Sequence, residues 1–117
     1  MNHDDSHLGR AEALVRRGAG GEEVLPAEPA PSVRDIGARA GFGRAWTSTS
    51  VRASVYLFDS HDEASAAEAQ LEAQAPAGRQ VAGTVNGPLL LWATADATDE
   101  AGEAVIERLL SSFAGDE

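Results

Sequence analysis

The sequence has neither cysteine nor lysine, and none of its apolar runs is long. The absence of cysteine excludes disulfides and thiolate chemistry. No apolar run approaches the length of a membrane span. The first seven residues are acidic and polar, which does not fit a signal peptide. The chain as written is therefore expected to be soluble and cytoplasmic; if a leader segment has been removed, it would be extracytoplasmic.

Positive charge is scarce in the second half of the chain. Residues 1–58 carry seven acids and seven arginines, whereas residues 59–117 carry twelve acids and two arginines, which accounts for the whole net charge of −10. Because phosphate binding needs a basic face, this distribution argues against a nucleic-acid partner. An acidic, solvated surface that aids solubility is the simpler interpretation.

Length and composition indicate one globular domain. The chain of 117 residues is 43% apolar, which is enough for a modest single core. We expect a flexible arm over residues 1–7 and a single domain over residues 8–117. Within that domain, residues 8–41 should form short helices and a proline-rich connector, and residues 43–115 should form a core of sheet and helices.

The strongest local signal is a hairpin between Val81 and Ala95. Asn86 and Gly87 separate two apolar, β-branched runs, a pattern typical of a type I′ turn. The run from Leu89 to Ala93 is apolar on both faces, so its strand should lie inside a sheet that is covered on both sides.

The remaining patterns complete an α+β fold. Ser60 and Glu63 form a capping box before an alanine-rich helix, and Thr98 is the expected cap of a last, strongly amphipathic helix. The predicted antiparallel sheet has about four strands, and the two helices should pack on one of its faces. The predicted strands are 43–49, 51–58, 79–85 and 88–95, and the predicted helices are 61–75 and 99–114.

Alternation along the strands places large apolar side chains on the sheet face that these two helices leave bare. Such a patch is seldom left in water. It suits either a cover made by the N-terminal half or a second chain packed sheet to sheet, and we favour the homodimer. The predicted binding face consists of Arg52, Tyr56, Phe58, Leu90 and Trp92.

Two resemblances bear on function. Residues 32–41 resemble the turn-crossing segment of tetracycline-repressor-like helix-turn-helix regulators, but the β-branched stretch 46–58 stands where a recognition helix should follow. The stretches 55–60, 86–92 and 109–115 together look like a group of small bacterial lipoproteins of unknown function. That resemblance implies a short α+β domain and no reaction. This chain lacks the signal peptide and the lipidated cysteine of the group.

The sequence contains no recognised catalytic, cofactor or metal motif. Asp59 at a strand end and His61 in a first helical turn are the residues to consider for acid–base work, and a turn and a helix start account for both. The preferred hypothesis is therefore a non-enzymatic binding or protein-interaction domain that uses one sheet face, without a cofactor or metal. The alternatives are a ferredoxin-like dimeric carrier or enzyme with a pocket between sheet and helices, and a helix-turn-helix regulator.

Overall fold

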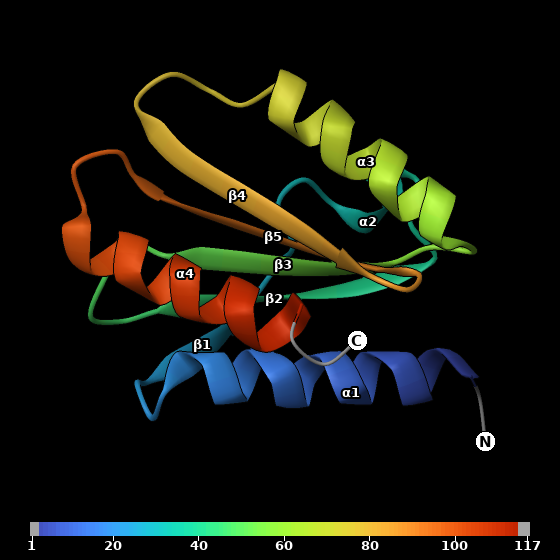
Figure 1. Cartoon of the computed structure of the whole chain (residues 1–117), viewed down its shortest axis with the longest axis horizontal. Helices are drawn as coiled ribbons and strands as arrows, with labels where there is room; N and C mark the ends of the chain where they lie inside the picture. The colour runs from blue at the N-terminus through green and yellow to red at the C-terminus, as the bar shows by residue number, and fades with distance from the viewer. Residues whose placement is uncertain (1–2, 115–117) are drawn as a thin grey trace.

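The computed structural model describes residues 3–114 and shows five strands and four helices (Figure 1). The strands are β1 (Val24–Ala27), β2 (Ala40–Trp46), β3 (Arg52–Leu57), β4 (Arg79–Asn86) and β5 (Leu89–Asp96). The helices are α1 (His3–Ala19), α2 (Val33–Ile36), α3 (His61–Ala73) and α4 (Glu100–Ala114). The α+β class is confirmed.

All strand pairs in the sheet are antiparallel, in the order β1-β2-β3-β5-β4. The prediction of about four strands omitted β1, which pairs with β2 at the edge and carries Pro26, a residue tolerated at sheet edges. The first predicted strand, 43–49, also lies too far along the chain. Residues 47–50 form the bend into β3. Thr47 and Ser48 donate to Glu23 and Glu22, and only the Thr49 hydroxyl bonds locally, by accepting from the Val51 N–H.

The turn between β4 and β5 differs from the expected type I′ turn. Asn86 pairs directly with Leu89, so the two central residues are Gly87 and Pro88. Gly87 has a φ of +59°, and no residue other than glycine has a positive φ in the described chain. Because proline fixes φ near −65°, only the first central position is left-handed, which is the type II′ pattern.

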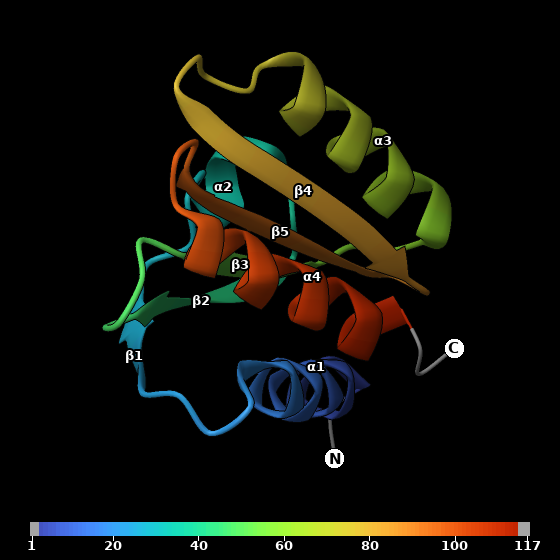
Figure 2. The same cartoon turned by 60° about the vertical axis from the view of Figure 1, so that its left-hand side comes forward.

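One face of the sheet is covered by α1 and α4, which lie side by side (Figures 1 and 2). The sequence led us to expect a flexible arm over residues 1–7 and a short first helix, but α1 begins at His3 and runs for 17 residues. Gly18 allows the close approach of the two helices, since a Cβ there would lie 3.0 Å from the Cα of Leu109. The side chains of α1 and α4 therefore form one core with this face, which includes Leu14, Val55, Leu91 and Phe113.

The opposite face is covered by α3 and α2, which corrects the prediction that the helices 61–75 and 99–114 share a face (Figure 1). β3 and β4 run parallel to each other, because each is antiparallel to the intervening β5. The α3 crossover that joins them must pass over one face, and the right-handed preference of such crossovers decides which. α4 leaves β5 on the other side.

The proline-rich segment between β1 and α2 also crosses this second face. The backbone N–H of Ala30 donates to the Ser54 hydroxyl at 3.0 Å, and the Tyr56 hydroxyl donates to the carbonyl oxygen of Pro31 at 2.6 Å. The segment predicted as a connector is therefore part of the cover of the sheet.

Asp99, not Thr98, caps α4. Its Oδ1 accepts from the Gly102 N–H at 2.8 Å, and its Oδ2 accepts from the hydroxyl and the N–H of Ser50 at 2.6 and 2.9 Å. The Ser50 hydroxyl bond first, and then the two backbone bonds, hold the pKa of Asp99 below its usual value of 3.8. One carboxylate thus links the start of α4 to the bend between β2 and β3.

Replacing Asp99 with asparagine should reduce stability in a pH-dependent way. The folded-state pKa is lower than the unfolded-state pKa, so the carboxylate stabilises the protein above pH about 4, and this contribution is lost as pH falls through the lowered pKa. Urea unfolding should show a larger stability difference between wild type and Asp99→Asn at pH 7 than at pH 2.5. The control Asp35→Asn removes the same charge from α2. A difference for Asp99→Asn that does not vary with pH would contradict this role.

Candidate functional site

The structure buries four of the five residues predicted to form a binding face. Tyr56 and Leu90 are 0% exposed, Trp92 4% and Phe58 6%. The expectation that this patch is left bare by the helices is wrong, because α3 packs its small stripe of Ala64, Ala67 and Leu71 directly on it. A sheet-to-sheet contact through this face would first require α3 to leave. Self-association by another surface stays a prediction.

Arg52 is the one predicted residue that solvent reaches freely. It is exposed at the start of β3, opposite Thr94 of β5. Within residues 3–114 its guanidinium has no hydrogen bond or ion pair. A cation without a counter-ion beside an otherwise covered face is available to an anionic ligand.

Tyr56 serves the packing of this face rather than chemistry. Its hydroxyl donates to the Pro31 carbonyl oxygen at 2.6 Å, and its ring lies 6.5 Å from that of Phe58. Burial raises the pKa of Tyr56 to about 12, against a smaller lowering effect of the Ser54 hydroxyl. Tyr56 therefore stays protonated at neutral pH and cannot act as a base there.

A pocket of about 290 Å³ opens between the end of α3 and the second face of the sheet. Trp92 and Val81 contribute the sheet side, and Leu71 contributes the helix side. Two proline-containing segments close it, Ala30–Pro31 before α2 and Ala75–Pro76 after α3. Most of its lining is apolar, and the polar members are Gln74, Arg79 and Thr94. It is the kind of concave, largely apolar site with a few polar groups that takes small ligands.

A smaller slot of about 30 Å³ shares Ala30, Trp92 and Thr94 with this pocket, so the two are adjacent. The slot adds two arginines, one carboxylate and two small residues to the lining: Arg44, Arg52, Glu28, Ala53 and Ser54. On the pocket side, Arg79 is held in place, since it donates to Asp96 at 2.5 Å and to the Thr94 hydroxyl at 3.0 Å. Three guanidinium groups thus lie at the polar margin of an apolar pocket. Arg79 and Arg44 are paired with Asp96 and Glu12, and Arg52 has no ion pair within residues 3–114.

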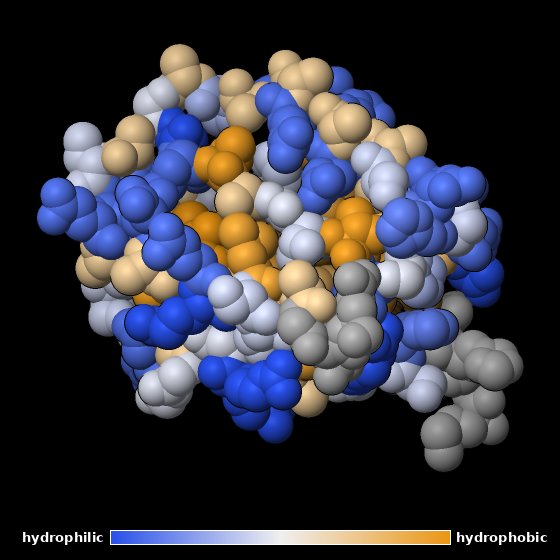
Figure 3. All heavy atoms as spheres, viewed as in Figure 1, coloured by the Kyte–Doolittle hydropathy of each residue, from blue (hydrophilic) through white to orange (hydrophobic). Residues whose placement is uncertain are grey.

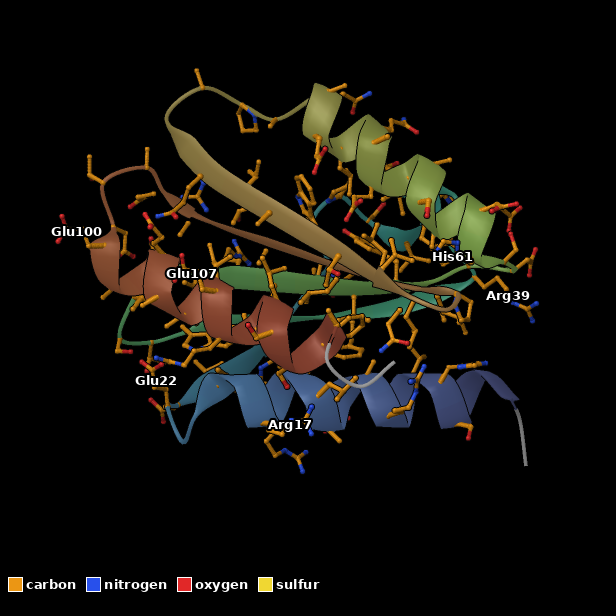
Figure 4. The ribbon with its side chains drawn as sticks, viewed as in Figure 1. Arg17, Glu22, Arg39, His61, Glu100 and Glu107 are labelled. Carbon is orange, nitrogen blue, oxygen red and sulfur yellow. The ribbon has the colours of Figure 1, made fainter. Side chains whose placement is uncertain are left out.

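The acid–base candidates of the sequence lie at the opposite end of α3. Figure 4 shows His61 and Arg39 together where this helix begins. Asp59 accepts from Arg39 at 2.6 Å, and His61 Nδ1 is 3.9 Å from Asp62 Oδ1 with both side chains largely exposed. His61 does not line the pocket at Trp92. Among the described residues no buried third group orients the His–Asp pair, so a helix start accounts for these residues.

The segment that resembles a helix-turn-helix is followed by a strand. α2 has four residues, ends at Gly37 with a φ of 76°, and leads into β2 at Ala40. The position of a recognition helix is therefore occupied by sheet.

Sequence reasoning missed the walls of the pocket. Pro31 lies in the expected proline-rich connector, Leu71 in the expected helix 61–75 and Pro76 directly after it, but none of these predictions brings the three residues together. The pocket exists because these segments meet over Trp92. The only sequence signal was the apolar character of β5 on both faces, which required a cover without identifying it.

Comparison with protein-family models, with curated proteins and with solved structures gives no significant match. No group of three or more histidine, cysteine or acidic residues within residues 3–114 is arranged to hold a metal ion. None of the helices in the described part of the chain is long and apolar enough to cross a membrane.

Proposed function

We propose that the chain is a non-enzymatic binding domain whose ligand site is the pocket over Trp92, on the sheet face predicted to bind. The observation that carries the proposal is a pocket of about 290 Å³ with apolar walls and arginines at its margin. The proposal keeps the binding function that the sequence analysis favoured. It places the ligand in a pocket between sheet and helix, as the alternative of a ligand carrier required.

The lining favours a small molecule with an apolar ring or chain and one acidic group. Trp92, Leu71 and Val81 offer apolar contacts but no hydrogen-bond partners other than the indole N–H. Arg52 has no counter-ion among the described residues and can pair with a carboxylate or sulfonate. An uncharged apolar ligand would leave that cation unused.

The residues around the pocket support binding rather than catalysis. Among the described residues the pocket lining includes no acid, no histidine and no serine, and the Thr94 hydroxyl already accepts from Arg79. The adjacent slot adds Glu28 and Ser54, and the Ser54 hydroxyl already accepts from the Ala30 N–H. A nucleophile needs a base within hydrogen-bond reach, and a general acid or base needs an accessible titrating group. The pocket itself offers neither, and in the slot no hydrogen bond joins Glu28 to Ser54 among the described residues.

The fluorescent probe 8-anilinonaphthalene-1-sulfonate tests the site, since it combines a naphthalene ring with an anionic group. We expect saturable binding with enhanced emission. Ala75→Phe places a ring in the pocket and should weaken binding about tenfold or more, which corresponds to about 1.4 kcal/mol. Arg52→Ala removes one charge pair at an exposed position and should weaken it about two- to fivefold.

Matched variants separate lost binding from lost structure. Ala69→Phe adds the same ring to an exposed α3 position that does not line the pocket, and Arg34→Ala removes an exposed arginine from α2. Both should bind the probe like wild type. Thermal unfolding of all four variants identifies any that fail to fold. If Ala75→Phe and Ala69→Phe are both folded and weaken probe binding equally, the pocket is not the binding site.

A further inference from the structure

β4 is an edge strand without the usual protection. Within residues 3–114 it pairs only with β5, in a continuous register of eight residues, so its outer side presents unpaired backbone N–H and C=O groups. Natural proteins usually keep an edge strand from pairing with another chain by a proline, a bulge or a lysine in the strand, or by making the strand short. The other edge of this sheet follows that rule, because β1 has four residues and includes Pro26. β4 has no proline, and its one charged residue, Arg79, is paired with Asp96.

The edge strand lies between two helices. β4 runs across the front of the molecule with α3 on one side and α4 on the other (Figure 2). Hydrophobic residues reach the surface in this region (Figure 3). Four apolar side chains here are half-buried. Val81 and Val85 pack on the core between the sheet and α3, and Ala82 and Leu110 pack on the core between the sheet and the helices α1 and α4. A strand added to β4 would cover all four.

Carboxylates flank the edge. A Cβ built on Gly83, in the middle of β4, would lie 3.2 Å from Oε2 of Glu68 on α3, so this carboxylate overhangs the strand. Glu72 is one turn further along the same side of α3. Burial, and then the charge of Glu72, raise the pKa of Glu68. Neither glutamate has an ion pair within residues 3–114.

We propose that β4 binds an extended, basic segment of a partner protein, which adds to the sheet as a sixth strand. The backbone edge supplies hydrogen bonds, the alternating apolar side chains supply a surface to cover, and Glu68 and Glu72 select lysine or arginine. A second copy of this chain fits less well, because two-fold pairing of β4 with itself brings the glutamate pairs of both chains to one edge, and the one charged residue of β4, Arg79, is already paired with Asp96. This site adjoins the ligand pocket, with which it shares Arg79 and Val81 of β4, but Glu68 and Glu72 do not line that pocket.

A synthetic peptide tests the proposal with the full chain. The peptide alternates lysine and valine over eight residues, and its binding is followed by backbone amide chemical shifts at low salt. We expect the largest shifts in β4 and weaker ones in the facing sides of α3 and α4. The double variant Glu68→Gln, Glu72→Gln should lower the affinity about tenfold, from two charge pairs of up to about 1 kcal/mol each. Added salt should weaken the binding.

Three controls make the result specific. The variant Asp35→Asn, Asp62→Asn removes two charges away from β4 and should change the affinity less than twofold. A peptide with N-methyl groups on alternate residues, and one with glutamate in place of lysine, should both lose binding. Equal binding of either altered peptide, or shifts centred outside β4, would overturn the proposal. Shifts in β4 that grow with protein concentration in the absence of peptide would also overturn it, in favour of self-association.

Discussion

Phe113→Ala is expected to lower the free energy of unfolding by about 3–5 kcal/mol, although the residue lies in the last turn of the last helix. Phe113 is 0% exposed and belongs to the core that α1 and α4 form with the sheet. Its carbonyl oxygen accepts from the side-chain amide of Asn86 at 2.8 Å, a buried bond to the end of β4. Removing the ring therefore leaves a cavity in a region that is held on several sides and cannot readily collapse.

Urea unfolding, followed by circular dichroism, measures this effect. The control Ser111→Ala alters an exposed position two residues earlier on the same helix and should change the stability by less than about 0.5 kcal/mol. Similar midpoints for Phe113→Ala and Ser111→Ala would mean that the end of α4 frays in solution. If Phe113→Ala lowers the free energy of unfolding by the full expected amount, the final turn of α4 unfolds together with the rest of the domain.

Gly43→Val is expected to cost about 3 kcal/mol, the upper end of the range for overpacking, because the obstacle is backbone. A Cβ at Gly43 would lie 2.6 Å from the carbonyl oxygen of Ala27 and 2.9 Å from the carbonyl carbon of Glu28. That stretch begins the segment that crosses the second face and receives the Tyr56 hydroxyl bond at Pro31. Valine at position 43 should push the segment away from the sheet.

Tyr56 reports on that displacement because it is the only tyrosine in the chain. Burial raises its pKa to about 12, so partial exposure should move the pKa toward 10, and ultraviolet titration detects the phenolate. Gly9→Ala is the matched control, since nothing lies within 4 Å of a Cβ there; it should stabilise α1 by about 0.5–1 kcal/mol and leave the Tyr56 titration unchanged. An unchanged titration in a folded Gly43→Val variant would contradict the packing of residues 27–31 on the sheet.

Elements with strong local signals could be predicted from the sequence. The Ser60 cap works as expected, with the Glu63 N–H donating to the Ser60 hydroxyl at 3.2 Å. The α4 stripe of Val105, Ile106 and Leu109 is buried, and β4 and β5 form the expected hairpin. These features depend on interactions between residues close together in the chain, so local sequence patterns are enough to predict them. Asn86 shows the limit of such signals: the hairpin was predicted around it, but it pairs with Leu89 at the end of β4 and its side-chain amide donates to the carbonyl oxygen of Phe113.

The sequence by itself determined that this chain is an α+β domain with an antiparallel sheet whose central strands need cover on both faces. Only the tertiary structure decided which segment covers which face. Tyr56, Leu90 and Trp92 alternate with equally apolar neighbours, so nothing in the pattern of β3 or β5 distinguishes an aromatic face that is left bare from one that lies under α3. That choice depends on the path of the crossover between β3 and β4 and on the approach of residues 27–31, and both are contacts between segments distant in sequence.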